Sequence, residues 1–429
     1  MNRALFALAC LLAEACFAAA IPIKQSIELW IDPSQATFEG EVRIEVVLDK
    51  PSDAVWLNAK DLDIAEAFVG SARAQVESTD EALGLHVSKP IAGRTQLRIR
   101  YRAKADDKST LGPYRRQVAG DWYFFTTFTP IEARKAFPCF DEPRYKIPWT
   151  MTIHAPEVNR AYANGREHSM GKDARNWNVT SFETVGKIPS EVVAFAVGPF
   201  EVLTGGLDRV ITLSGHAKEG TAALESAPGL RKKLEDYTGI RYAFGKLDHV
   251  ALPANAYGAV ENPGLITYQA NTLLIPPGNM ARLRSVEAHE MAHQWFGNLV
   301  TQASWEDVWL SEGFATWLSA KVTDPLELLR SRSQIMDQDT VSARPVRLAM
   351  SDRKQIQDVY SRFVYSKAGS VLLMLEGWIG ERAMQQGLRS YLRRYRDSVA
   401  TTDQLAEELR RADRKSTRLN SSHVALSRM

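Results

Sequence analysis

Cysteine is scarce in this chain of 429 residues, which contains only three. Cys10 and Cys16 lie in a stretch interpreted below as a leader, so Cys139 is the single thiol of the remainder. One thiol cannot form an intramolecular disulfide, and it excludes a cysteine-rich zinc knuckle. A lone cysteine could serve as a nucleophile, but it is more commonly a small buried hydrophobe.

The chain also lacks an excess of charge of one sign. Lys and Arg total 53, Asp and Glu total 51, and the formal net charge is +2. Nucleic-acid binders carry a large single-signed field, so we expect no nucleic-acid partner. After the first twenty residues no run approaches the roughly 20 apolar residues that span a bilayer. The mature chain is therefore expected to have no transmembrane segment.

The start of the chain is typical of a secretory signal. Arg3 precedes an apolar run over residues 4–13, and three alanines at 18–20 form a small-residue cleavage site. We therefore predict a signal peptide over residues 1–20 and an exported protein, periplasmic or secreted. A buried N-terminal helix is the alternative. A lipid anchor on Cys16 is less favoured, because Glu14 stands where small apolar residues are needed.

The end of the chain differs from the rest. Residues 413–429 resemble the conceptual translation of a sequencing-adapter oligonucleotide, so we expect a non-native tail and a natural gene that continues. A disordered polar tail is the alternative.

Period-two alternation dominates from about residue 21 to about residue 204. In one such run Val42, Ile44 and Val46 alternate with Arg43 and Glu45. This pattern predicts half-buried strands, and turn clusters between the runs indicate a largely antiparallel β domain over residues 21–204.

Helical spacing replaces alternation in the second half. It is present over residues 284–297, 309–321 and 382–396, where apolar side chains recur every three or four positions. The second half is therefore predicted to be mainly helical.

The segment 289–293 has the sequence HEMAH, an H-E-x-x-H pattern. On a helix, His289 and His293 lie one turn apart on one face, about 5–6 Å between Cβ atoms, so both imidazoles can reach one ion. Glu290 can then reach a water on that ion without ligating the ion itself. Two incidental histidines with a glutamate between them are the alternative. Gly297 and Asn298 are predicted to cap this helix.

A zinc site needs a third protein ligand, and Glu312 supplies one. It follows after eighteen intervening residues, enough for a second helix to return beside the first. Two histidines and one glutamate, with one open position for water, are typical of catalytic zinc rather than of closed structural sites. We predict one Zn²⁺ per chain, held by His289, His293 and Glu312, with Glu290 as general base.

Three further segments resemble motifs of the M1 (gluzincin) zinc aminopeptidase family. Residues 257–264, YGAVENPG, resemble its G-x-M-E-N segment, with Val260 in place of methionine. Residues 136–143, AFPCFDEP, and residues 365–369, YSKAG, resemble two others. With H-E-x-x-H these make four ordered motifs, and the resemblance covers roughly residues 25–410.

The resemblance implies an α+β multidomain fold. The antiparallel β domain would be followed, over residues 205–412, by a thermolysin-like, mainly helical catalytic domain. It also implies that the C-terminal helical domain of the family is almost wholly missing. Outer helices of the catalytic domain should then expose an apolar face.

The resemblance also implies roles for the motif residues. Glu261 would pair with the free α-ammonium of a peptide, and Asn262 would belong to the same substrate-binding segment. Backbone groups of Gly258 and Ala259 would bind the substrate like an added strand. Tyr365 would donate its phenol to the developing oxyanion. A surface glutamate and a core tyrosine are the alternatives for Glu261 and Tyr365.

Four positions depart from the family pattern. Where members usually carry T-Q-x-E, this chain has Thr127 and Thr129, so the charge that helps to hold the substrate amine is missing. Ser311 replaces the usual asparagine before the third ligand, and Ser319 stands where a glutamate often supports the metal site. We expect altered amine binding and a less certain metal affinity.

These observations predict an exported zinc aminopeptidase whose partners are peptides with a free N-terminus. A broader zinc hydrolase, an endopeptidase or an epoxide hydrolase, is one alternative, which the missing charge at Thr129 favours slightly. A non-catalytic peptide-binding module that has kept the fold is another.

Overall fold

The computed structural model describes residues 20–276, 280–330, 336, 339, 344–350, 355–361 and 363–413. Of the predicted signal peptide, residues 1–20, only Ala20 is described, and almost all of the predicted tail lies outside the described residues. Across the described part of the chain, no helix is both long enough and apolar enough to cross a membrane.

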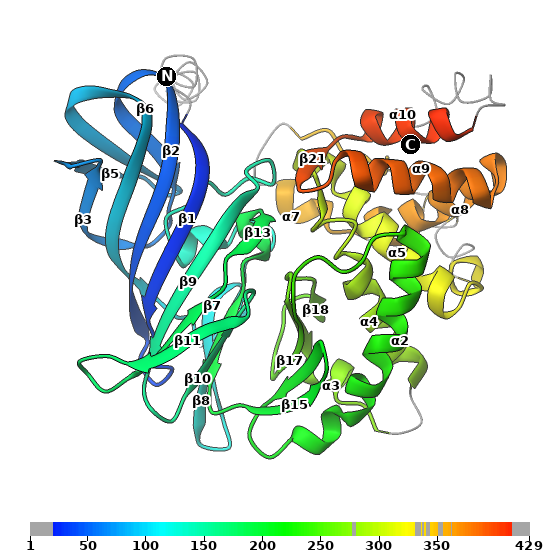
Figure 1. Ribbon diagram of the computed structural model, residues 1–429, viewed down its shortest axis with the longest axis horizontal. Coiled ribbons are helices and arrows are strands. Elements are labelled where there is room, and N and C mark those ends of the chain that lie inside the picture. The colour runs from blue at the N-terminus through cyan, green and yellow to red at the C-terminus, as the bar shows by residue number, and fades with distance from the viewer. Residues whose placement is uncertain are drawn as a thin grey trace.

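Two sheets form the first half of the chain (Figure 1). The larger has ten strands in the order β11-β12-β9-β1-β2-β6-β3-β4, with β13 paired to β9 and β5 paired to β6. These are β1 (Ala20–Trp30), β2 (Thr37–Asn58), β3 (Asp63–Val69), β4 (Ala72–Arg73), β5 (Gln75–Ser78), β6 (Ala82–Lys104), β9 (Ile147–Ala155), β11 (Glu167–Lys172), β12 (Asn178–Phe182) and β13 (Val185–Ile188). The smaller has the order β10 (Arg160–Ala163), β14 (Phe195–Gly198), β8 (Asp121–Thr127) and β7 (Gly112–Val118).

The pairing within these sheets confirms the predicted β-rich first half. Strand pairs are antiparallel except for β1 with β9, which run parallel. The alternation seen in the sequence gives β2 one buried face, where Val42, Ile44 and Val46 are fully buried while Arg43 is exposed. Alternation determines which face of a strand is buried, but not which strand lies beside it, so the parallel pair could not be predicted.

A third sheet begins the second half. It is mixed, with the order β15 (Glu201–Gly205), β16 (Asp208–Thr212), β17 (Leu247–Leu252), β19 (Leu265–Gln269) and β18 (Ala259–Val260). Residues 201–204, grouped with the first half by periodicity, pair with β16 in this sheet. Among the described strands β18 pairs only with β19, so it forms the edge of the sheet and presents a side where a strand could be added.

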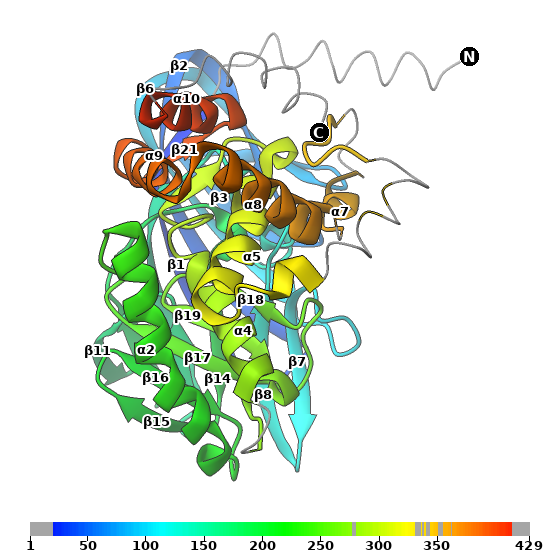
Figure 2. The same cartoon turned by 90° about the vertical axis from the view of Figure 1, so that its right-hand side faces the viewer.

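Helices cover this third sheet and form the rest of the second half (Figure 2). They are α2 (Thr221–Thr238), α3 (Ala270–Leu273), α4 (Met280–Ala292), α5 (Trp309–Thr323), α7 (Ile356–Val359), α8 (Ala368–Ile379), α9 (Glu381–Arg394) and α10 (Thr402–Ala412). A π-helix over Phe363–Lys367 precedes α8, and short 3-10 helices include η1 (Ala133–Lys135), η2 (Ser190–Val192), η3 (Ala217–Gly220) and η4 (Trp305–Asp307). A parallel pair, β20 (Val300–Gln302) and β21 (Ser398–Ala400), ties the loop after α4 to the end of the domain. The predicted change from strands to helices is confirmed.

One predicted helix end is wrong. α4 ends at Ala292, whereas Gly297 and Asn298 were expected to cap it. After Ala292 the hydrogen bonding changes. Gln294 N–H donates to Met291 O, three residues back, instead of to a carbonyl four residues back as in an α-helix. His293 thus stands just beyond the last helical residue, where its direction depends on the turn that follows.

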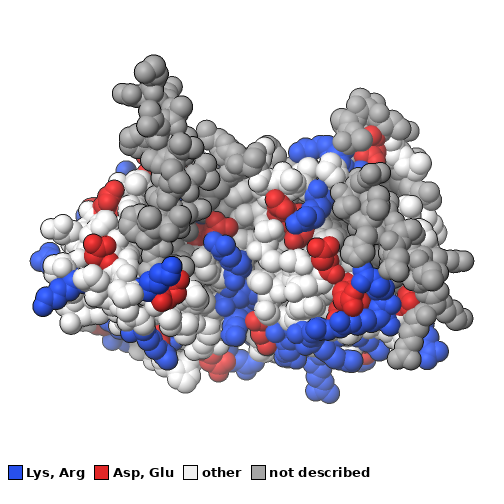
Figure 3. Space-filling view, turned by 90° about the horizontal axis from the view of Figure 1, so that it is seen from above, with Lys and Arg blue, Asp and Glu red and all other residues white. Residues whose placement is uncertain are grey.

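Two faces of the helical half differ in character. Met374 and Trp378 on α8 are each more than half exposed, an apolar surface of the kind expected for the outer helices. On α9 and α10, arginines lie among acids, and Arg394 and Arg411 both pair with Glu408. On the face in Figure 3, Lys and Arg gather at the lower right of the view, with a few acids among them.

Candidate active site

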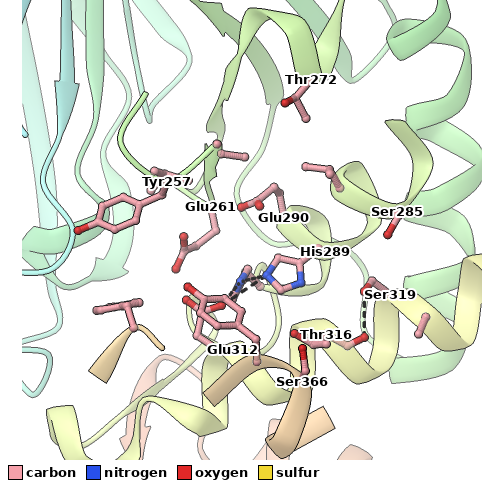
Figure 4. Close-up of a pocket in the computed structure, with 18 of the residues that line it drawn as sticks. Tyr257, Glu261, Thr272, Ser285, His289, Glu290, Glu312, Thr316, Ser319 and Ser366 are labelled. Carbon is pink, nitrogen blue, oxygen red and sulfur yellow. Dashed lines mark hydrogen bonds and ion pairs between the residues drawn. The ribbon is translucent and has the colours of Figure 1, made fainter. Parts of the chain in front are cut away.

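A cavity of about 430 Å³ opens between the two halves of the chain (Figure 4). Its walls combine segments that lie far apart in the sequence. They include Thr129 after β8, Gly258, Ala259 and Glu261 around β18, His289, Glu290 and His293 at α4, Glu312 on α5, and Tyr365 on the π-helix. The volume is within the range of small-ligand sites, about 300–1,000 Å³.

Three side chains converge at the floor of the cavity. His289 Nε2 lies 3.1 Å from His293 Nε2. Glu312 Oε2 lies 3.4 Å from His289 Nε2 and 3.2 Å from His293 Nε2. The structure therefore brings together the three residues predicted to be metal ligands, because α4 and α5 pack side by side in the core of the second half.

The far side of the His293 ring is fixed by a short chain of hydrogen bonds. His293 Nδ1 lies 2.9 Å from Ser311 Oγ, and Ser311 Oγ donates to Phe296 O at 3.1 Å. With its hydroxyl proton on Phe296 O, Ser311 can accept only from an Nδ1–H, so that in a neutral His293 the lone pair would be on Nε2, on the side of Glu312. Ser311 thus performs an orienting role at the position where the sequence lacks asparagine.

The electrostatic environment of His289, His293 and Glu312 favours a positive charge between them. Burial opposes a proton on His293, but the carboxylates of Glu261 and Glu312 outweigh it and raise the His293 pKa to about 10. Burial likewise opposes ionisation of Glu312, yet His293 and the contacts from His289 lower its pKa to about 2. A cation at this point would be held by charge as well as by geometry.

Glu290 and Tyr365 lie on the wall beside this floor. Burial, together with the neighbouring carboxylates of Glu261 and Glu312, raises the Glu290 pKa well above its ordinary value. Tyr365 stacks at 6.1 Å between ring centroids on His289. Burial and the charge of Glu312 raise the Tyr365 pKa, so its phenol keeps its proton and can donate it in a hydrogen bond.

The loop that carries Glu261 is anchored to the end of α4. Gln294 Nε2 and Asn298 Nδ2 both donate to the Glu261 carbonyl, at 2.9 and 2.8 Å. A Glu261 oxygen, a Glu290 oxygen and a His293 nitrogen lie within 4.8 Å of one another. Gly258, just before β18, has φ +83°, a conformation that other residues rarely adopt. The positive φ of Gly258 thus shapes the loop, and the two amides that follow α4 fix its position.

One predicted residue does not face the cavity, and two unpredicted ones line this cavity or a smaller one beside it. Asn262 is only 1% exposed, and its amide donates to Thr267 Oγ1, which makes it a support of the loop. Glu191 in η2 and Tyr360 after α7 line a smaller cavity beside the main one, and Tyr360 lines both. In the sequence Glu191 is the single acid of the mainly apolar run 188–200, which makes it unusual there but does not indicate which residues it faces.

Comparisons with known proteins agree with this arrangement. The Peptidase M1 N-terminal domain matches residues 21–192, and the Peptidase family M1 domain matches residues 222–423. The chain is 30% identical to aminopeptidase 2, mitochondrial, of Saccharomyces cerevisiae, over 91% of this chain and 44% of the relative. It is 30% identical to aminopeptidase N of Haemonchus contortus, over 86% and 42%, and to glutamyl aminopeptidase of Sus scrofa, over 88% and 44%.

The chain thus spans less than half the length of these curated relatives. Both matched family domains coincide with the two structural halves, and the cavity lies where the halves meet. The chain belongs to peptidase family M1.

Proposed function

We propose that this chain is a zinc-dependent aminopeptidase, which hydrolyses the N-terminal bond of peptides. The observation that carries the proposal is the convergence of His289, His293 and Glu312 at 3.1–3.4 Å from one another. Atoms that bind one zinc ion tetrahedrally at about 2.0–2.1 Å lie about 3.3 Å apart. Glu312 Oε2 is buried and faces both imidazole nitrogens, as expected of a ligand atom.

His289, His293 and Glu312 would hold the ion. When bound there, zinc supplies a Lewis acid for the scissile carbonyl and lowers the pKa of a water to about 7. Glu290 would accept a proton from the attacking water and later return it to the leaving amine. Tyr365 would donate a hydrogen bond to the oxygen on which negative charge develops.

Substrate positioning would depend on the edge strand and on Glu261. Peptide backbone would pair with the free edge at Gly258 and Ala259, which line the cavity. Glu261 would then receive the α-ammonium, which limits cleavage to the first bond of the peptide. One observation favours a broader hydrolase, because Thr129 lines the cavity without a charge.

The test compares two substrates that differ only at the amine. The full chain should hydrolyse leucine p-nitroanilide and leave N-acetyl-leucine p-nitroanilide intact; a zinc chelator should abolish the activity and added zinc should restore it. Equal cleavage of both substrates would support the broader hydrolase, and binding of peptides without any turnover would support a binding module.

Glu290→Gln tests the general base. It should lower kcat by about 10²–10⁴-fold while zinc content stays the same. Glu287→Gln is a matched control on the same helix, because Glu287 faces Ser226 and burial raises its pKa to about 8. That side chain is already mostly neutral at pH 7, so its replacement should leave kcat unchanged. Unchanged turnover in Glu290→Gln would remove the proposed mechanism.

A further inference from the structure

A second, much smaller cavity adjoins the candidate metal site. Its volume of about 10 Å³ suits one water-sized group. It is lined by η2 of the first half, the loop after α4, α5 and the segment before the π-helix. The lining residues that matter here are Glu191, Glu261, Asn298, Gln302 and Glu312.

This cavity is lined by residues with unsatisfied acceptors. Apart from the proposed ligand atom of Glu312, three buried oxygens of its walls accept no hydrogen bond: Glu191 Oε2, Asn298 Oδ1 and Gln302 Oε1. The amide nitrogens of the two neutral residues are already engaged, on Glu261 O and on Glu191 Oε1. Buried acceptors without donors are costly, at about 1–3 kcal/mol each. The natural occupant is therefore a small group rich in N–H or O–H donors.

Glu191 is held in place by a buried network. Arg134 and Asp141 are each 1% exposed and pair at 2.8 Å, and Asp141 Oδ1 accepts from Ser190 Oγ at 2.6 Å. Asp141 belongs to the AFPCFDEP motif, so that motif fixes the turn on which Glu191 stands. Thr129 Oγ1 donates to the carbonyl of Glu191 at 3.3 Å.

One side chain fixes the Glu191 turn relative to the Glu261 loop. Asn164 Nδ2 donates both to Val192 O at 2.9 Å and to Pro263 O at 2.8 Å, while Asn164 Oδ1 accepts from Ala194 N–H. Gly264 allows this close approach, because a Cβ at that position would lie 2.2 Å from Asn164 O. The spacing of the two carboxylates is thus built into the junction of the halves.

Carboxylates outnumber basic side chains among the lining residues of the two cavities, where Arg282 is the one Lys or Arg of the described lining. Glu191 is 5% exposed, and burial with the charges of Glu261 and Glu312 raises its pKa well above the ordinary value. Glu290 adds a fourth carboxylate to the same region. A divalent ion on the histidines would offset two of these four negative charges, and one further cation would offset a third.

We propose that Glu191 is the second carboxylate of the amine-binding site, and that it and Glu261 share the substrate's α-ammonium. An ammonium group offers three donors and a positive charge, which matches both the unsatisfied oxygens and the charge balance. Glu191 then supplies the charge that Thr129 lacks. This inference rests on the proposed aminopeptidase function, since only that function requires a free amine.

The test measures binding without turnover. In the zinc-loaded Glu290→Gln protein, calorimetry compares leucinamide with isocaproamide, which is leucinamide without its amine. The parent should prefer leucinamide, and adding Glu191→Gln should reduce that preference about tenfold to a hundredfold while affinity for isocaproamide stays the same. Glu287→Gln in the same background is the control and should keep the full preference.

The outcomes separate the two proposals. A parent that shows no preference for the amine would end the proposed function together with this inference. A parent preference that survives Glu191→Gln would overturn the inference alone and assign the small cavity to water or a monovalent ion. Equal weakening of both ligands would also overturn it, because the effect would then be structural. Glu191→Gln removes a buried like charge, so its melting temperature should be equal to or above that of the parent.

Discussion

At the scale of single residues, the site depends on how the ligands are oriented as much as on which residues they are. His293 follows the last residue of α4, and its ring direction is set by Ser311 and Phe296. Such supporting hydrogen bonds fix the tautomer of a ligand histidine and raise its basicity. In the proposed metal site, Ser311 would therefore take the place of a longer amide side chain.

Ser311→Ala should weaken zinc binding by about 10–100-fold, because it removes the acceptor of the His293 Nδ1–H. Competition with a chromogenic chelator measures this affinity. Ser319→Ala is the matched control: Ser319 lies on the same helix and cavity wall, but its hydroxyl donates only to Thr316 O. Equal affinities in wild type and Ser311→Ala would show that the hydrogen bond does not support the metal.

The sequence predicted some residues of the candidate site and missed others, and there is a physical reason for which ones were missed. His289, Glu290 and His293 could be predicted because their spacing on one helix places them together without reference to the rest of the chain. Glu191 could not, because its neighbours in space come from α5 and the loop after α4, and only the docking of the two halves brings them close. Asn262 was assigned a binding role from its motif, whereas local hydrogen bonding directs its side chain inward.

At the scale of elements, the helical periodicity over residues 309–321 and 382–396 corresponds closely to α5 and α9. The periodicity over 284–297 overran the end of α4 by five residues. Apolar side chains such as Trp295 and Phe296 remain buried in the turn after the helix, so the pattern of burial continues where the helix does not. Edge strand β18 has only two residues and no periodicity to detect.

Gly258→Ala tests the edge strand. Its φ of +83° makes a Cβ unfavourable by about 1–2 kcal/mol, although no atom would lie within 4 Å of it. We expect KM for peptides to rise severalfold with little change in kcat, because the strain distorts the edge that aligns the substrate. Gly93→Ala carries similar strain at φ +73° in the first half, also in open space. It should reduce stability without changing KM, and a matching rise in KM would exclude a specific role for β18.

At the scale of the whole molecule, the two halves are joined by buried polar contacts as well as by apolar packing. Lys146, just before β9, donates from Nζ to the carbonyls of Asn298, Leu299 and Ser398. Asn298 also belongs to the proposed amine cavity. A cation of the first half thus holds the loop that follows the candidate metal ligands in the second.

Lys146→Met should destabilise the folded chain in a manner that depends on pH. Burial lowers the Lys146 pKa from 10.5 to about 7, although Asp397 acts in the opposite direction. Between these two values the folded chain binds fewer protons than the unfolded chain, so this group makes the wild type more stable as pH rises. The variant lacks that contribution.

The difference in the free energy of unfolding, wild type minus Lys146→Met, should therefore grow as pH rises from about 7 to about 9.5. Denaturant titrations at several pH values measure it. A difference that stayed constant or shrank over this range would show that Lys146 keeps an ordinary pKa in the folded chain.

The most direct test of the proposed zinc site is to measure, by atomic emission, the zinc content of the purified chain and of two variants. The wild type should contain one zinc per chain, and both His293→Ala and Glu312→Gln should lose most of it after dialysis against a weak chelator while remaining folded. One zinc per chain retained in both variants, or none bound by the wild type even from zinc-containing buffer, would contradict the account.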